Sequence, residues 1–122
     1  MAIGVPESIG YDYSTSEVAT GKRWINGKMI YCKVVDIGNL PNTTYKRIDV
    51  ATNVSEIVSI KGLAPLPYGG TDYYMPLPFM DSQQTGNIKL LGLLTNGTAQ
   101  VQIETFSDRS SATGYIIVEY TK

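Results

Sequence analysis

Apolar and polar residues alternate along much of the second half of the chain. Over residues 98–105 one side of the pattern is apolar and the other is polar. The apolar set is Ala99, Val101 and Ile103, and the polar set is Gln100, Gln102 and Glu104. Residues 115–121 repeat the pattern, with one face made of Ile116, Val118 and Tyr120. A period of two places successive side chains on opposite faces of a strand, so both stretches predict β-strands.

Two Asn-Gly dipeptides between apolar arms predict hairpin turns. Asn26-Gly27 lies within Trp-Ile-Asn-Gly-Lys-Met-Ile-Tyr, and Asn96-Gly97 separates predicted strands at 87–94 and 98–105. A type I′ turn needs positive φ at both central residues, which favours this dipeptide. We therefore expect a type I′ hairpin at each position.

The middle of the chain adds further predicted strands. Residues 28–37 carry apolar side chains on both faces, which predicts a strand covered on both sides, by the sandwich or by another copy of the chain. Residues 44–50 and 56–63 are expected to be strands, with Val58 and Ile60 inward in the latter. Residues 65–72 have the Gly- and Pro-rich composition of a loop.

Two shorter segments complete the prediction. Residues 73–79 contain Pro76 and Pro78, which cannot donate to a ladder, so they form an edge strand or an irregular extended segment. Residues 11–14 are expected to be a short strand, and Ser14 to Glu17 has the spacing of a capping box, which predicts one helical turn ending by Gly21.

Together these patterns predict about seven or eight short strands and almost no helix. This is typical of an all-β antiparallel sandwich or jelly-roll-like fold. Residues 1–10 are predicted to be an N-terminal arm or linker, and residues 11–122 a single head domain.

The composition of the chain argues against several classes of partner and of active site. The formal net charge of −1 argues against a nucleic-acid partner. The apolar runs are too short for a membrane-spanning helix, and the first residues lack the features of a signal peptide. The chain has no histidine and one cysteine, Cys32, which we interpret as a small buried hydrophobe. We expect no enzyme activity, no cofactor and no metal site, since Asp36, Asp49 and Asp81 lack calcium-loop spacing.

Several blocks of sequence together resemble a known family. They are Tyr13-Ser14-Thr15-Ser16-Glu17, the stretch from Gly21 to Tyr31, Ile57 to Gly62, Leu77-Pro78-Phe79, and the ending Ser107 to Lys122. In this order they resemble the C-terminal receptor-binding head domain of bacteriophage tail-fibre and receptor-binding proteins. The resemblance covers residues 11–122.

The resemblance implies a β-sandwich head, commonly a homotrimer, that sits at the tip of a fibre in the virion and meets the host surface. It implies contacts with other virion proteins through the N-terminal arm. It carries no catalytic residues over to this chain, and its ligand-contacting residues vary too much to transfer.

The candidate ligand-binding residues lie mainly between residues 65 and 75. Tyr68, Asp72, Tyr73 and Tyr74 cluster on the predicted loop, where binding residues are often found. Tyrosine offers a flat apolar face and a hydroxyl, which suits glycans and proteins alike. The alternative is that these tyrosines cover a sheet edge or a neighbouring subunit.

Trp24 and Arg109 are weaker candidates. Trp24 stands beside a predicted hairpin tip, where an indole can stack on a sugar, but we favour a packing role. Arg109 follows Asp108 in a Ser-Asp-Arg-Ser loop, for which we favour side-chain-to-backbone bonds and a local ion pair over ligand contact.

Three functional hypotheses follow. The first is a phage adhesin that recognises a bacterial surface saccharide or protein without catalysis. The second is a structural virion module, a trimerising tip or capsid decoration, with no ligand of its own. The third is a carbohydrate-binding module of a secreted enzyme, and a hydrolase ranks last because no pair of carboxylates stands out.

Overall fold

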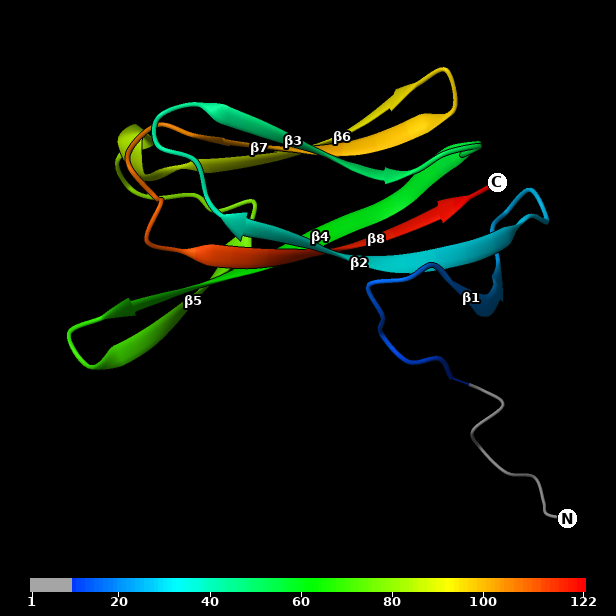
Figure 1. Ribbon diagram of the computed structural model, residues 1–122, viewed down its shortest axis with the longest axis horizontal. Helices are drawn as coiled ribbons and strands as arrows, with labels where there is room; N and C mark the ends of the chain where they lie inside the picture. The colour runs from blue at the N-terminus through cyan, green and yellow to red at the C-terminus, as the bar shows by residue number, and fades with distance from the viewer. Residues whose placement is uncertain (1–9) are drawn as a thin grey trace, which may run out of the picture.

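The computed structural model of the protein describes residues 10–122 and consists of two facing antiparallel sheets (Figure 1). The strands are β1 (Val18–Arg23), β2 (Met29–Asn39), β3 (Tyr45–Ala51), β4 (Glu56–Tyr68), β5 (Thr71–Leu77), β6 (Ile88–Thr95), β7 (Thr98–Thr105) and β8 (Thr113–Thr121). The only helical element of the described part is the short 3-10 turn η2 (Gln84–Gly86). The predicted all-β sandwich is confirmed.

The larger sheet has five strands in the order β1-β2-β8-β4-β5, and the smaller has three in the order β3-β7-β6. Every pairing is antiparallel. The central strand β8 lies between β2 and β4, which places residues from distant parts of the chain side by side.

The core fills the space between the sheets. The predicted inward residues of β7 and β8 all have an exposed fraction of 0 %: Ala99, Val101, Ile103, Ile116, Val118 and Tyr120. Removing each large apolar side chain from water contributes about 1.5–3 kcal/mol. The alternation in the sequence therefore identified the two strands that anchor the opposing sheets.

The two Asn-Gly turns differ. Asn96 and Gly97 have φ of 50° and 82°, and Thr95 pairs with Thr98, so the predicted type I′ turn is confirmed there. At the first turn only Gly27 has positive φ, at 85°. Its N–H donates to the carbonyl of Trp24 at 2.8 Å, which fits a longer turn closed by a glycine bulge. The type I′ prediction for Asn26-Gly27 was wrong.

The predictions for residues 11–17 were also wrong. Residues 11–14 belong to no strand, and no helical turn follows them. The Ser14 hydroxyl oxygen accepts a hydrogen bond from the Ser16 N–H at 3.0 Å, a local turn that uses the side chain the capping box required. Strand β1 then begins at Val18 and runs through Gly21, whose φ is 80°.

The predicted loop at residues 65–72 is a hairpin. Strand β4 continues to Tyr68 and pairs with β5 down to the Tyr68–Thr71 pair. Pro65 and Pro67 are tolerated because both lie beyond Leu63, the last β4 residue that pairs with β8. The expected edge strand at residues 73–79 is confirmed as β5, which ends at Leu77.

A bulge shifts the inner face of β4. The register with β8 slips between Ile57 and Ser59, so Ile57 faces Tyr120 and packs against the core, as Ile60 does. The prediction that Val58 faces inward was therefore wrong, because an unpaired residue at a bulge breaks the period of two.

Candidate functional site

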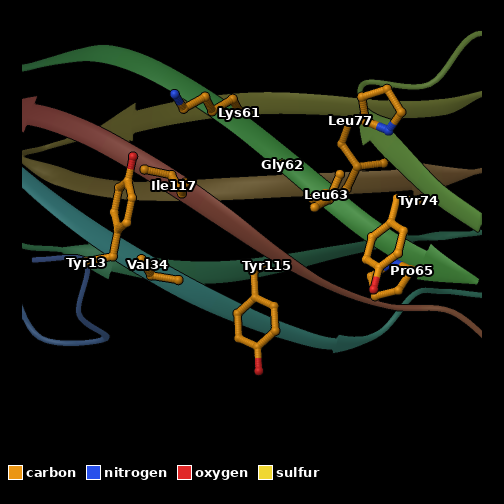
Figure 2. Close-up of a pocket in the computed structure, with 11 residues that line it drawn as sticks. Tyr13, Val34, Lys61, Gly62, Leu63, Pro65, Tyr74, Leu77, Tyr115 and Ile117 are labelled. Carbon is orange, nitrogen blue, oxygen red and sulfur yellow. The ribbon is translucent and has the colours of Figure 1, made fainter. Parts of the chain in front are cut away.

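The outer face of the five-stranded sheet contains an apolar groove of about 680 Å³ (Figure 2). It is lined by Tyr13, Val34, Lys61, Gly62, Leu63, Pro65, Tyr74, Pro76, Leu77, Tyr115 and Ile117. These residues come from β2, β8, β4 and β5 and from the segment that precedes β1. Four strands therefore build one surface.

Strand register explains why these side chains meet. Ile117 of β8 pairs with Val34 on one side and with Lys61 on the other. Two residues along β8, Tyr115 pairs with Leu63. Because directly paired residues share a face, the outward positions of three adjacent strands form one continuous patch.

The groove is chemically uniform. Four of its apolar side chains stay well exposed, at 61 % for Tyr13, 60 % for Tyr74, 50 % for Tyr115 and 45 % for Leu63, whereas Leu77 is buried. Lys61 is the only charged residue of the lining. The floor is suited to apolar contact, because it offers few polar partners to a hydrophilic ligand.

Residues 11–17, here called the strap, lie along one end of the same outer face. The Val34 N–H donates to the Ser14 carbonyl at 2.8 Å. The Tyr11 hydroxyl donates to Glu119 at 3.3 Å, and the Ser59 hydroxyl donates to the same carboxylate at 2.9 Å. The outward side chain of Cys32 is buried, with an exposed fraction of 2 %.

Burial and hydrogen bonding shift the pKa values of these groups. Burial raises the pKa of the Cys32 thiol, which keeps it protonated and confirms it as a small buried residue. Burial is also the largest effect that raises the pKa of Tyr11 to about 12. Burial alone would raise the pKa of Glu119, but hydrogen bonds from Ser59 and Tyr11 and the nearby positive charge of Lys22 hold it below its ordinary value.

A second polar cluster ties the strap to the end of β8. The Tyr120 hydroxyl donates to Glu17, which also forms an ion pair with Lys122 at 3.0 Å. Burial alone would raise the pKa of Glu17, but the bonds from Tyr120 and Lys122 lower it. The strap is thus held at both ends by carboxylate contacts.

The four clustered candidates lie on the β4–β5 hairpin but on both of its faces. Tyr68 and Tyr73 are on one face, with ring centroids 6.4 Å apart. Asp72 and Tyr74 are on the opposite face, and Tyr74 lines the groove. The hairpin extends past the end of the smaller sheet (Figure 1), so all four side chains are exposed. The structure brings them together only as two pairs.

Trp24 lies far from this hairpin. It is half-buried at the β1–β2 turn, at the opposite end of the molecule (Figure 1). The structure does not bring it together with Tyr68 or Tyr74.

Arg109 has an internal role. Its guanidinium donates to the Gly86 carbonyl at 2.7 Å and lies 5.9 Å from the centre of the Phe79 ring. Asp108 accepts hydrogen bonds from the Ser110 N–H and hydroxyl, and these bonds lower the pKa of Asp108. The expected side-chain-to-backbone bonds are present, but within residues 10–122 the structure gives Asp108 and Arg109 no ion pair, so the expected local ion pair is not found.

Sequence reasoning missed most of the groove. It noted that residues 28–37 are apolar on both faces, which marks Val34. It did not read Tyr115 and Ile117 in the same way, although they are the outward residues of the central strand. Leu63 ended the predicted strand 56–63 but was not singled out as an outward residue, and Pro65 was missed because residues 65–72 were taken for a loop.

Other site types find no support in the described part of the chain. Residues 10–122 contain no group of three His, Cys, Asp or Glu side chains placed to hold a metal ion. Among the same residues, no helix has the length and apolar character needed to cross a membrane. No protein-family model, curated protein or solved structure matches this chain.

Proposed function

We propose that the protein is a bacteriophage attachment head that recognises a bacterial surface saccharide or protein without catalysis. The observation that supports this most is the β4–β5 hairpin, which projects from the sandwich and displays paired tyrosines. The sequence resemblance to tail-fibre heads supports the same function and a position in the virion.

The hairpin is suited to recognition. Tyr68 and Tyr73 are 74 % and 52 % exposed. Each ring offers an apolar face that can stack on a sugar or a protein side chain, and a hydroxyl that can bond to polar groups. Gly69 and Gly70 both have positive φ, which closes the tip tightly and limits the entropy lost on binding.

Weak single sites suit an attachment protein. A pair of exposed tyrosines provides limited contact area, so we expect low affinity for each copy. Several copies acting together raise the effective concentration and the overall avidity. The resemblance predicts three such copies.

The test is adsorption of the purified protein to host cells and to an array of bacterial glycans. Tyr68→Ala and Tyr73→Ala are each expected to weaken binding by about tenfold or more, in the range of interface hot spots. Tyr45→Ala is the matched control, because Tyr45 is 54 % exposed on the smaller sheet. Binding that is absent in the parent chain, or equal in all three variants, contradicts the proposal.

One observation favours a second candidate function. The apolar groove suits contact with another protein, as expected of a structural virion module with no ligand of its own. This module would be incorporated into virions but would not adsorb to cells. Virions whose adsorption survives deletion of the gene would favour this candidate over the attachment head.

A further inference from the structure

We propose that the groove is a contact surface for a second copy of this chain, and that Lys61 of one copy pairs with Asp72 of the other. This inference concerns self-association and does not depend on the ligand of the hairpin tip. It assigns a partner to the outer face of the five-stranded sheet.

The first step is the character of the surface. Leu63, Tyr74 and Tyr115 are 45–60 % exposed and adjoin one another across β4, β5 and β8. Large contiguous apolar patches on soluble proteins mark interaction sites. A saccharide would leave many hydroxyls without partners over this floor, whereas an apolar protein surface would not. The groove therefore favours a protein partner.

The second step is charge. Lys61 is the single cation of the groove, and Asp72 is an exposed anion on the same face of the β4–β5 pair. Within residues 10–122 the structure gives neither of them an ion pair. Both charges are available to a partner.

The third step is the spacing of the two charges. Asp72 pairs with Pro67, which is six residues along β4 from Lys61, so they are separated by about 20 Å at 3.3 Å per residue. The apolar residues Leu63, Pro65 and Tyr74 lie between them on the same face.

This arrangement is self-complementary. A second copy placed with its strands reversed brings each Lys61 against the Asp72 of its neighbour, with the apolar centres in contact. In a two-fold dimer both pairs lie in one interface. A second copy is thus the partner whose apolar centre and charges match this face.

The test is sedimentation of the full chain over a range of concentrations. We expect the parent chain to self-associate, and Lys61→Asp or Asp72→Lys alone to weaken association by about tenfold or more, because each puts like charges together. The double variant with both changes restores opposite charges and is expected to recover association. Recovery separates a direct pair from a general effect on the fold.

A second pair of variants tests the apolar residues that lie between the two charges. Leu63→Asp is expected to abolish association, whereas Leu91→Asp should not. Leu91 is the matched control, because it is 47 % exposed on the outer face of the smaller sheet, against 45 % for Leu63. Circular dichroism of each variant verifies that the fold is kept.

Three results would overturn the inference. A parent chain that is monomeric at every concentration leaves another virion protein as the occupant of the groove. Association that is equally sensitive to Leu63→Asp and Leu91→Asp excludes this face as the contact. A double charge variant that stays dissociated excludes the Lys61–Asp72 pair. Tyr68→Ala, which tests the attachment function, is expected to leave association unchanged, so the two proposals fail separately.

Discussion

The two outer faces of the sandwich differ although both belong to antiparallel sheets. On the three-stranded sheet the outward side chains bond to one another: Arg47 donates to Gln102 and Gln100 donates to Asp49, each at 2.7 Å. On the five-stranded sheet the corresponding surface is the apolar groove around Tyr115. The outer face of the three-stranded sheet is therefore mainly polar, with Tyr45 and Leu91 as exposed exceptions, whereas the five-stranded sheet gathers its exposed apolar side chains into one groove.

The difference between the two outer faces is visible in the residue patterns of β7 and β8. From Thr98 to Glu104, strand β7 alternates strictly between half-buried polar and buried apolar residues, and its last residue, Thr105, is buried and polar. Strand β8 has buried residues at Ile116 and Val118 but places Tyr115 and Ile117 on the outer side. A strand that contacts only one core needs one apolar face, so β8 has the pattern of a strand with contacts on both sides.

The largest expected effect separates the inner and outer faces of β8. Ile116 is fully buried, so Ile116→Ala is expected to lower the free energy of unfolding by about 3 kcal/mol, since it leaves a cavity in the core. Ile117→Ala, one residue away on the outer face, is expected to cost less than about 1 kcal/mol at low protein concentration. Urea unfolding measures both. Equal losses would break the distinction between the two faces.

A smaller effect is expected in the turns, where the two sheets should behave alike. Gly27 and Gly97 have φ of 85° and 82°, and a side chain at such φ is strained. Gly27→Ala and Gly97→Ala are each expected to lower the free energy of unfolding by about 1 kcal/mol. Gly10→Ala is the control, because φ is not positive there and an added Cβ meets nothing within 4 Å. A loss in only one turn would mean that the sheets differ in more than their outward residues.

The loss of folding stability at low pH should depend on carboxylates that contact the five-stranded sheet. Glu17 and Glu119 have pKa values lowered from the ordinary 4.5, so the unfolded chain binds their protons more readily than the folded chain does. Their contribution is complete above the ordinary value and is lost as pH falls through the lower, folded value. Glu119→Gln is expected to flatten the fall in stability below pH 4.5, measured by thermal melting. Glu104→Gln, on the smaller sheet, is the control, and an equal change there would contradict the assignment.

The smallest expected effect is the loss of folding stability at high pH that comes from Tyr11. The pKa of Tyr11 is raised from 10.0 to about 12, so the unfolded chain loses this proton first. Stability from Tyr11 is complete below pH 10 and declines as pH rises toward 12. Tyr11→Phe is expected to reduce this decline in pH-dependent unfolding experiments. An unchanged alkaline profile would show that Tyr11 does not occupy this partly buried, hydrogen-bonded position in solution.

Much of the fold followed from local patterns. The strict alternation of residues 98–105 predicted β7, and Asn96-Gly97 predicted its turn, because strand period and turn geometry are local properties. The errors came from long-range pairing. Pro65 and Pro67 read as loop residues, yet they fit in β4 because the pairing of β4 with β8 ends at Leu63, before either proline.

The candidate site was predicted only in part. Sequence reasoning selected Tyr68, Asp72, Tyr73 and Tyr74 as one cluster, but alternation along the hairpin places them on two faces. The groove depends on the register of β8 between β2 and β4, which brings Val34 next to Ile117. The local sequence does not reveal which strands are neighbours or in what register they pair, so the groove could be recognised only from the structure.

The surface reactivity of two tyrosines in the parent chain shows most directly whether copies of the chain pack through the groove. Tyr115, in the groove, and Tyr45, on the smaller sheet, are 50 % and 54 % exposed in a single copy. Hydroxyl-radical footprinting is therefore expected to modify them equally in dilute protein. As concentration rises, we predict that Tyr115 becomes protected while Tyr45 does not. Equal modification of both tyrosines at every concentration would contradict the account.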